Sequence, residues 1–232
     1  MLNKFLNLLF PETCPICQKP CLNHETAPIC TDCWKSIRQY NGPLCRKCGT
    51  PLVSEVSIIC GECLKEEPAF EYARSFGLYD DPLRKGINLL KYHGKKRLSR
   101  PLSALLMKAG VPDADAVIPV PLYHKRLRKR EFNQSALISK YIAEERKSRL
   151  LLDCLVKVRD TLPQVGLRYK ARVKNIKGAF KVNNIDLIKD KKIILIDDVV
   201  TTGATIRECS MTLKKAGAEK IYVISLAHGI SD

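Results

Sequence analysis

The chain has 232 residues, 45% of them hydrophobic, and carries a formal net charge of +16 with a pI of about 9.4. The first 68 residues contain seven basic and seven acidic side chains, so the whole positive excess lies after Pro68. This asymmetry favours an anionic partner, either a nucleic acid or a polyphosphate substrate, over the alternative that the charge serves solubility alone. No apolar run approaches the roughly 20 residues that cross a bilayer, so we expect no membrane insertion.

The chain begins with the apolar segment 1–10, which we expect to form a short amphipathic helix docked on the following domain. The segment holds one lysine and lacks the small-residue cleavage site of a signal peptide.

Residues 1–68 are predicted to form a small zinc-binding domain, because eight of the eleven cysteines form four CxxC pairs there. The pairs are Cys14 and Cys17, Cys30 and Cys33, Cys45 and Cys48, and Cys60 and Cys63. This spacing suits structural tetrahedral zinc, in one or two sites, and implies a reducing compartment, so we expect a cytoplasmic protein. Sequential and interleaved pairing both fit the spacing. Cys21, with His24, is an alternative ligand, but a bystander role for Cys21 is favoured.

Residues 69–232 are predicted to form a second domain that begins with a strand and two helices. The strand covers 70–79, a turn follows at 80–82, and the helices cover 82–110 with a break near Gly94. This helical segment carries no acid between Arg84 and Arg100. Its basic side chains form either a solvated helix face or a track for nucleic-acid phosphates. The candidate nucleic-acid ligands are Lys91, Lys95, Lys96 and Arg97.

The middle of the chain continues with alternating strands and helices. A buried strand is predicted over 116–120, a basic loop over 122–131 and a helix over 133–145. A third strand is predicted over 151–158. The polar and basic segment 159–178 is either a loop that closes over a substrate or a plain surface loop. Strands over 192–197 and 220–227 complete a parallel sheet whose apolar runs indicate burial on both faces.

The stretch 193–206 carries the most specific functional signal. A continuous apolar strand is followed directly by Asp197 and Asp198, which we place at its carboxyl end, where open α/β sheets bind ligands. Small and hydroxyl-bearing residues follow and then a helix, and such a helix start can hold a phosphate. The stretch lacks the lysine of a Walker A loop. Carboxylates beside a phosphate cradle suit a sugar phosphate, because they accept hydrogen bonds from sugar hydroxyls. The structural alternative is an ordinary strand end and helix cap.

This stretch, IILIDDVVTTGATI, resembles the phosphoribosyl pyrophosphate (PRPP) motif of type I phosphoribosyltransferases. The four CxxC pairs, LLKYHGKKRLSRPL, AVIPVPLYHKRLRKREFNQ and VRDTLPQVGLRYKARVKNIKGAF together resemble the ComF family (ComFC, GntX-like) over nearly the whole chain. The resemblance implies a type I phosphoribosyltransferase-like parallel sheet with flanking helices, preceded by a small cysteine-rich zinc domain.

The resemblance also implies roles for residues. Asp197 and Asp198 would hold the ribose hydroxyls, and Mg²⁺ would bind together with PRPP. The 5′-phosphate would be held by Val199, Thr201, Thr202, Gly203, Ala204 and Thr205. The pyrophosphate would be stabilised by Arg126, Arg128 and Arg172. Thr161, Gln164, Arg168, Arg172 and Asn175 match a further family pattern. The chain departs from the family pattern RGFNQ at Glu131, which stands in place of the glycine.

Three functions follow from these observations. The ComF resemblance implies a PRPP-binding protein that handles imported single-stranded DNA during natural transformation, with a ComFA-type helicase as a possible partner. The alternative is an active transferase that moves ribose 5-phosphate from PRPP to an unidentified base or amine. A zinc-centred interaction protein with a decayed transferase domain is a third, less favoured function, because the acidic pair and the loop after it are intact.

Overall fold

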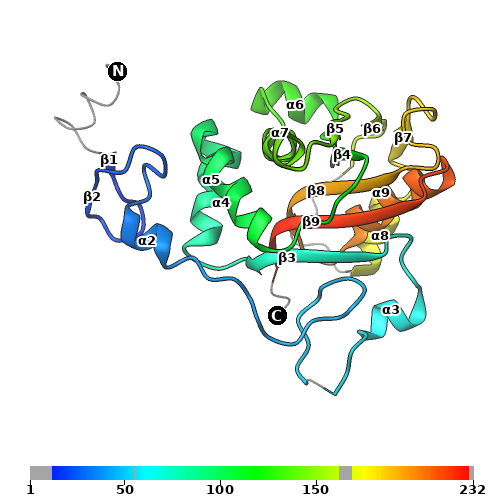
Figure 1. Cartoon of the computed structure of the whole chain (residues 1–232), viewed down its shortest axis with the longest axis horizontal. Helices are drawn as coiled ribbons and strands as arrows, with labels where there is room; N and C mark the ends of the chain where they lie inside the picture. Colours follow the sequence, from blue (N-terminus) through cyan, green and yellow to red (C-terminus); the bar gives the residue numbers. More distant parts are fainter. Residues whose placement is uncertain (1–11, 55, 162–168, 230–232) are drawn as a thin grey trace.

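The protein is built around one sheet of five parallel strands, in the order β3-β9-β8-β4-β5 (Figure 1). The structure is a computed structural model, and it describes residues 12–54, 56–161 and 169–229. The strands are β3 (Tyr72–Leu78), β4 (Ala116–Pro119), β5 (Arg149–Leu150), β8 (Lys192–Val200) and β9 (Lys220–His228). Every neighbouring pair in the sheet is parallel. The predicted α/β fold class is therefore confirmed.

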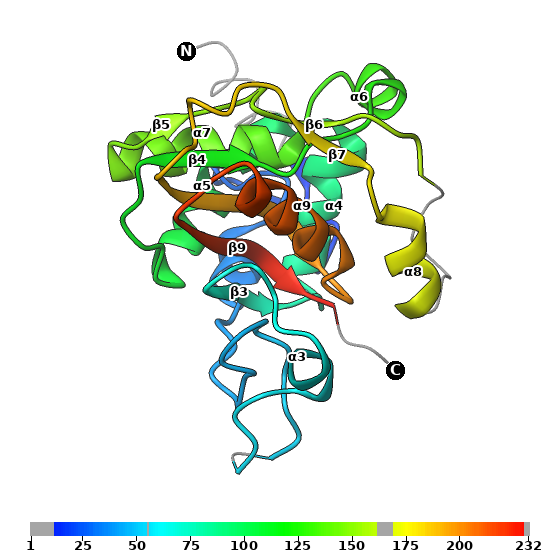
Figure 2. The same cartoon turned by 90° about the vertical axis from the view of Figure 1, so that its right-hand side faces the viewer.

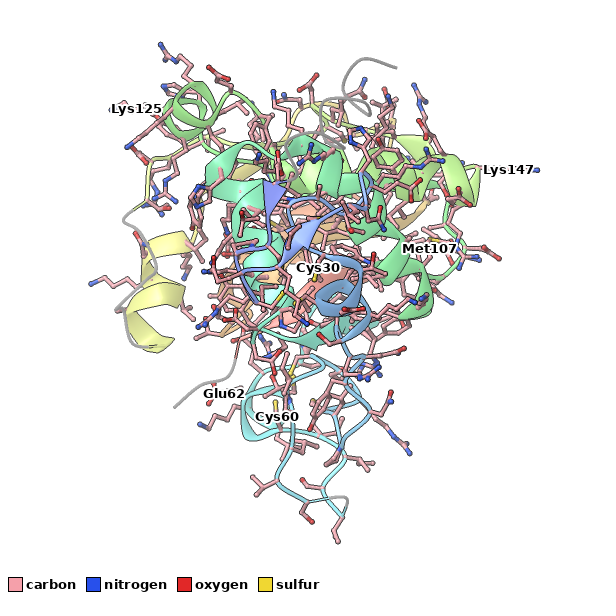
Figure 3. All side chains as sticks on the ribbon, turned by 90° about the vertical axis from the view of Figure 1, so that its left-hand side faces the viewer. Cys30, Cys60, Glu62, Met107, Lys125 and Lys147 are labelled. Carbon is pink, nitrogen blue, oxygen red and sulfur yellow. The ribbon has the colours of Figure 1, made fainter. Side chains whose placement is uncertain are left out.

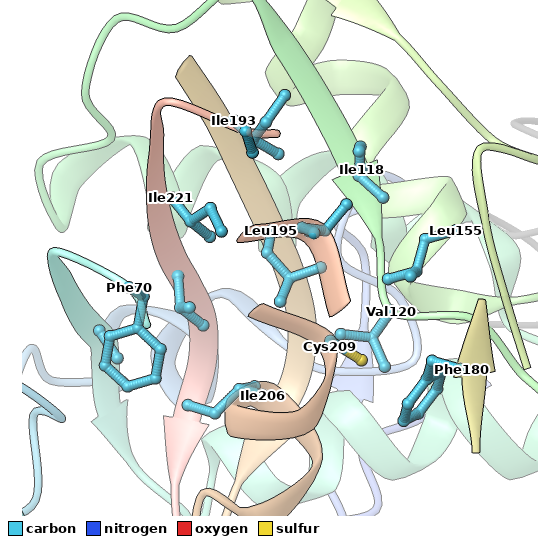
Figure 4. Packing of buried hydrophobic residues seen from close by; sticks show 14 of the residues in the cluster. Phe70, Ile118, Val120, Leu155, Phe180, Ile193, Leu195, Ile206, Cys209 and Ile221 are labelled. Atoms are coloured by element: carbon cyan, nitrogen blue, oxygen red, sulfur yellow. The ribbon is translucent and has the colours of Figure 1, made fainter. Parts of the chain in front are cut away.

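Both faces of the sheet are covered, which explains the unbroken apolar run in β8. Ile193 and Leu195 point to one face, and Ile194 and Ile196 point to the other; all four are fully buried. The first face is covered by α9 (Ala204–Lys215), α8 (Tyr169–Ile176) and a small antiparallel sheet, as Figures 2 and 4 show. The second face is covered by α4 (Leu83–His93), α5 (Ser99–Lys108) and α7 (Gln134–Arg146).

The helices begin and end at residues that the sequence marks. Helix α4 stops at Gly94, which has a φ of 63°, and the short 3₁₀ helix η1 (Lys96–Leu98) then leads into α5. The predicted helix pair interrupted near Gly94 is therefore confirmed. Helix α7 is capped by Asn133, whose side chain accepts a hydrogen bond from the backbone N–H of Ser135.

Two expectations for the middle of the chain are wrong. The predicted loop at 122–131 contains helix α6 (His124–Arg130), which consists mostly of lysine and arginine, both good helix formers. The strand predicted at 151–158 is shorter than expected, because within this range only β6 (Leu155–Lys157) is a strand. It pairs antiparallel with β7 (Phe180–Val182) instead of joining the parallel sheet, which β5 joins just before the predicted range.

The cysteine-rich region contacts the sheet domain in two separate places (Figure 1). The first part comprises β1 (Glu12–Thr13), β2 (Pro20–Cys21) and α2 (Thr31–Lys35); its buried cluster packs against Trp34 of α2 and Leu89 of α4. The second part ends in α3 (Gly61–Lys65), and its cysteines join the core on the α9 face. The boundary at residue 68 stays a prediction. The helix expected within residues 1–10 lies outside the described residues.

Candidate functional site

The acidic pair lies in β8, near its carboxyl end and just before the loop that leads to α9. The predicted strand end at Asp197 is wrong, because the ladder with β9 continues to Val200, which pairs with His228. Asp197 lines a small cavity in front of α9, whereas Asp198 is buried against α4. The two carboxylates therefore lie in different surroundings although they are adjacent in the chain.

Asp198 forms an ion pair with Lys91 of α4, with 2.7 Å between Nζ and Oδ2. The two side chains are only 5% and 21% exposed, so this is a largely buried pair. Burial alone would lower the pKa of Lys91, but the neighbouring Asp198 carboxylate raises it above its ordinary value. Lys91 is thus held charged beside the acidic pair, and its predicted role in nucleic-acid binding stays a prediction.

Asp197 binds its proton more tightly than an ordinary carboxyl group does. Burial and the negative charge of Asp198 raise the pKa of Asp197 to about 8, although the Lys91 ammonium acts in the opposite direction. Its Oδ1 accepts hydrogen bonds from the backbone N–H of Asp198 (2.9 Å) and from the hydroxyl of Ser135 on α7 (3.4 Å). The pair therefore offers carboxyl oxygens as hydrogen-bond acceptors to a ligand with hydroxyl groups.

The loop between β8 and α9 has the geometry of an anion site. Gly203 caps α9 with a φ of 74°, a left-handed conformation that glycine adopts without the Cβ penalty of other residues. The first turn of a helix leaves backbone N–H groups without intrahelical partners, and they point out of its end. Within the described chain, the buried Oγ1 of Thr202 has no hydrogen-bond partner. The cavity here has a volume of about 40 Å³. Its lining is Asp197, Val199, Val200, Thr201, Gly203, Ala204, Thr205 and Ile206.

Two larger basic cavities lie on either side of α6. One, of about 670 Å³, adjoins α4; the other, of about 610 Å³, adjoins the segment before α8. Arg126 and Lys129 border both cavities, whereas Arg128 is exposed and lines neither. Arg126 also donates a hydrogen bond to the carbonyl of Thr161 (2.6 Å). Of the expected pyrophosphate ligands, the structure thus brings Arg126 to the cleft.

Some predicted residues fall at the edge of what the structure describes. Arg172 lies on α8, but its side chain is outside the described set, and Gln164 and Arg168 fall in the segment that is not described. Thr161 is buried, and its hydroxyl accepts a hydrogen bond from Lys157 (2.8 Å). The roles proposed for these residues therefore stay predictions.

The other expected nucleic-acid ligands contact the protein itself. Lys95 Nζ lies 3.0 Å from a carboxylate oxygen of Glu12, and Arg97 binds the other oxygen at 2.5 Å. Arg97 also donates to the carbonyl of Ala27 (2.7 Å), so it joins the first cysteine-rich part to η1. Lys96 is exposed and lies 5.0 Å from the ring centre of Phe132. Of Lys95, Lys96 and Arg97, Lys96 is thus the one that lines the larger cavity.

The eight paired cysteines form two clusters, and the pairing is sequential. Cys14, Cys17, Cys30 and Cys33 form one cluster, and Cys45, Cys48, Cys60 and Cys63 form the other; within each, the sulfur atoms lie within 4.8 Å of one another. Sulfur ligands about 2.3 Å from a tetrahedral zinc ion lie about 3.8 Å apart, so both clusters fit structural zinc. Figure 3 shows that the two clusters, marked by Cys30 and Cys60, are well separated.

Cys21 belongs to neither cluster, which agrees with a bystander role. Its thiol lies within hydrogen-bond distance of the carbonyl groups of Ile29 (3.2 Å) and Asn23 (3.5 Å). The second cluster, in contrast, contacts the sheet domain through its ligands. Arg207 of α9 donates to Cys63 Sγ and to the carbonyl of Glu66, both at 3.0 Å. The second cysteine cluster is thereby attached to α9, the helix that follows the loop after the acidic pair.

Sequence reasoning missed three residues of this region. Lys157 on β6 is half-buried, and burial together with the charge of Arg126 lowers its pKa to about 8. Ser135 and Arg207 contact Asp197 and the second cysteine cluster, respectively. Each of the three acts across elements far apart in the chain, and no local pattern marks such contacts.

Comparisons with the sequences of known proteins agree with this geometry. A double zinc ribbon domain matches residues 5–64, and a phosphoribosyl transferase domain matches residues 137–232. Competence protein F of Haemophilus influenzae is 35% identical over 209 residues, which cover 86% of this chain and 90% of that protein. The DNA utilization protein YhgH of Salmonella typhi is 31% identical over 225 residues, which cover 93% and 96%. Glutamine PRPP amidotransferase from B. subtilis aligns with a TM-score of 0.39 and 20% identity, over 54% of this chain and 25% of that one.

The parallel sheet, the two cysteine clusters and the matched domains define a phosphoribosyltransferase-fold protein that carries a double zinc ribbon. With this level of identity over most of both chains, the protein belongs to the ComF family. In the described part of the chain, no helix has the length and apolar character needed to span a membrane.

Proposed function

We propose that the protein binds PRPP, together with Mg²⁺, at the carboxyl end of β8. The observation that carries this proposal is the buried Thr202 hydroxyl without a partner, next to a glycine-capped helix start and the acidic pair. The 5′-phosphate would occupy the loop from Thr201 to Thr205, and the ribose hydroxyls would donate to Asp197 and Asp198. The pyrophosphate would extend toward Arg126, with Arg128 and Arg172 as further candidates.

Mg²⁺ prefers oxygen ligands and often binds substrate phosphates together with a few protein carboxylates. It would reduce the charge that the pyrophosphate presents to the protein. Asp197 is the carboxylate nearest to the anion loop, and Arg126 and Lys129 would supply the remaining positive charge on the protein side.

Calorimetric titration of PRPP with Mg²⁺ into the zinc-loaded chain tests this proposal. Saturable binding is expected for the native protein, and its loss is expected in the double variant Asp197→Asn, Asp198→Asn. Asp113→Asn is a matched control, because this carboxylate is 93% exposed and precedes the amino end of β4, whereas the acidic pair lies near the carboxyl end of the parallel strand β8. Absence of binding to the folded native protein would overturn the proposal.

Two biological roles are compatible with such a site. We favour a role in DNA uptake and natural transformation, in the cytoplasm, with single-stranded DNA as ligand and a ComFA-type helicase as a partner. The names of the relatives support this role, since one is a competence protein and another a DNA utilization protein. The large positive charge supports it as well, because contacts to phosphates supply most of the non-specific affinity for nucleic acid.

A single-strand binding assay at several salt concentrations tests the DNA role. The affinity is expected to fall steeply as the salt concentration rises, because counterions are released on binding. Lys96→Gln is expected to weaken binding and reduce the salt slope, whereas Lys140→Gln, an exposed lysine on α7, serves as control. A flat salt dependence would exclude this role.

The second candidate is an active transferase. In that reaction a nucleophile on the acceptor forms a bond to C1 of the ribose, the bond from C1 to the pyrophosphate oxygen breaks, and the acceptor loses a proton. The intact acidic pair and the basic cleft support this candidate. Pyrophosphate release from PRPP in the presence of a set of bases and amines would distinguish it from binding alone.

A further inference from the structure

The larger basic cavity contains features that neither a sugar phosphate nor pyrophosphate requires. It has a volume of about 670 Å³ and lies between the end of α4 and the region where α6 meets α7. Its lining combines five cations with one acid and two aromatic rings. The lining residues are Lys91, Tyr92, Gly94, Lys96, Arg126, Lys129, Arg130, Glu131 and Phe132.

Tyr92 is the clearest of these features, because its side chain is exposed although it is large and aromatic. The residue is 64% exposed, while its neighbours Leu89 and Leu90 on α4 pack into the core. Arg130 Cζ lies 5.2 Å and Lys91 Nζ 5.8 Å from the ring centre. The ring is therefore held by cations from two elements, yet most of its surface is open to a ligand.

Phe132 forms a second aromatic wall of the same cavity. It is half-buried against the core on the α4 face, and Lys96 Nζ lies 5.0 Å from its ring centre. The lining of this cavity therefore contains an aromatic ring next to a cation twice. Such a pair can bind a planar base through the ring and the adjacent phosphate through the cation. A ligand with phosphates alone would be bound by the cations and would gain little from either ring.

The cavity also adjoins the acidic pair of the proposed PRPP site. Lys91 lines the cavity and forms the ion pair with Asp198, so one side chain belongs to both. Arg130 donates to the side chain of Gln134 (2.7 Å), next to Ser135, whose hydroxyl contacts Asp197. A ligand in the cavity therefore lies beside the acidic pair.

We propose that this cavity is a subsite for a nucleoside phosphate, with the base stacked on Tyr92 and the phosphate bound by Lys96 and Lys129. The ligand is either a free nucleotide or a nucleotide of a single strand, since both present the same base and phosphate. This inference rests on the proposed function for the identity of the neighbouring ligand, but not for the binding of the nucleotide itself.

Calorimetric titrations of the full zinc-loaded chain test the subsite with three probes: dTMP, ribose 5-phosphate and a short 5′-phosphorylated oligothymidylate. The variants are Tyr92→Leu, which removes the ring, and Tyr92→Phe, which retains it. Tyr123→Leu is the matched control, because Tyr123 precedes α6 and does not line the cavity; its ring is tilted against that of His124, with 4.1 Å between the ring centres. Tyr92→Leu is expected to weaken dTMP binding roughly tenfold, as base stacking on an aromatic side chain contributes that much. Tyr92→Phe and Tyr123→Leu are expected to bind dTMP as the native chain does.

Each outcome has one meaning. Equal affinities for dTMP and ribose 5-phosphate in a variant whose phosphate loop is closed (Gly203→Val), or no effect of Tyr92→Leu on dTMP binding, would overturn the proposal and leave a site for phosphate groups alone. If the oligothymidylate binds more tightly than dTMP and its binding remains sensitive to Tyr92→Leu, the subsite is supported and its ligand is a nucleotide of single-stranded nucleic acid. Similar affinities for the two probes, with the same sensitivity, indicate that the ligand is a free nucleotide.

A parallel titration with PRPP separates this inference from the proposed function. Gly203→Val places a β-branched residue at a φ of 74° and is expected to abolish PRPP binding while dTMP still binds. If the native chain binds dTMP in a Tyr92-dependent way but does not bind PRPP, the proposed function fails and the subsite stands. If PRPP binds and Tyr92→Leu leaves dTMP binding unchanged, the subsite fails alone.

Discussion

Lys91 of α4 forms an ion pair with Asp198 of β8, and thereby connects a helix near the start of the sheet domain to the acidic pair near its end. The 106 positions between the two residues include most of the domain. The pair is largely buried, so each charge depends on the other for its stability. Lys91 is consequently part of the candidate site, although it lies outside the stretch that resembles a PRPP motif.

Replacement of Lys91 by methionine is expected to destabilise the folded chain by about 3 kcal/mol, because it leaves the Asp198 carboxylate buried without its partner. Urea unfolding at neutral pH measures this change. Lys140→Met, at an exposed position on α7, is the control and is expected to alter the free energy of unfolding by less than about 0.5 kcal/mol. Equal stabilities of the two variants would contradict a structural role for the ion pair.

The raised pKa of Asp197 predicts a pH dependence of stability. Its carboxyl group binds a proton more tightly in the folded chain, with a pKa of about 8, than at its ordinary value of 3.8. The folded state therefore holds more protons than the unfolded state between these values, and the free energy of unfolding falls as the pH rises through this window. Lys91 stays charged throughout it, because its pKa is raised above 10.5.

The variant Asp197→Asn is expected to flatten this dependence and to be at least as stable as the native chain at pH 8. Urea unfolding from pH 5 to pH 8 measures the slope, and Asp113→Asn controls for removal of an exposed carboxylate. Parallel curves for the native chain and Asp197→Asn would show that Asp197 does not titrate in this window.

The sequence predicted the parts of the site that depend on local pattern. The buried run 193–196, the acids after it and the glycine before a helix are adjacent in the chain, and a strand, loop and helix start can be inferred from them directly. The spacing of the cysteines likewise predicts metal clusters. Local pattern did not choose between sequential and interleaved pairing, because that depends on which loops meet in space.

The contacts between distant elements were not predictable in this way. Lys91, Lys95 and Arg97 belong to one basic stretch, yet one binds Asp198 and the other two bind Glu12. A run of cations has the same appearance in the sequence whether it faces solvent or carboxylates from other segments. The strand predicted over 151–158 was wrong for a related reason, since apolar residues do not show which sheet they join.

Each cysteine cluster is expected to hold one zinc ion independently of the other. Cys17→Ser and Cys48→Ser should each lower the zinc content from two ions to one per chain, because the clusters share no ligand. Cys21→Ser should retain both ions, since Cys21 belongs to neither cluster. Elemental analysis or native mass spectrometry measures the content, and loss of both ions in a single variant would contradict independent sites.

Arg207 is expected to stabilise the second zinc centre. Its guanidinium donates to Cys63 Sγ at 3.0 Å, and a hydrogen bond to a charged partner contributes about 1.5–3 kcal/mol. Arg207→Met should therefore speed transfer of zinc from this centre to a chelator by roughly tenfold or more. The first centre is an internal control in the same protein, and Lys215→Met is a control on the same helix. An unchanged rate at the second centre would exclude this role of Arg207.

Glu131 combines an unfavourable backbone conformation with an unfavourable charge. It ends α6 in the left-handed region, with a φ of 66°, which costs a residue with a Cβ about 1–2 kcal/mol. It is also the only acid among the lining residues of the larger cavity. The position is the one where the ComF pattern has glycine, and the left-handed conformation gives the physical reason for that glycine.

Two variants separate these two effects. Glu131→Gly removes both the strain and the charge, and is expected to stabilise the chain by up to about 1 kcal/mol, since glycine also increases the entropy of the unfolded state. Glu131→Gln removes the charge but retains the strain, so its stability should match that of the native chain. Both variants are expected to bind pyrophosphate more tightly, because five cations then face no acid in the cavity lining. Urea unfolding and calorimetry measure the two effects. If Glu131→Gly is less stable than Glu131→Gln, the strain of the left-handed conformation is outweighed by side-chain contacts that glutamate and glutamine share or by the greater unfolded-state entropy of glycine.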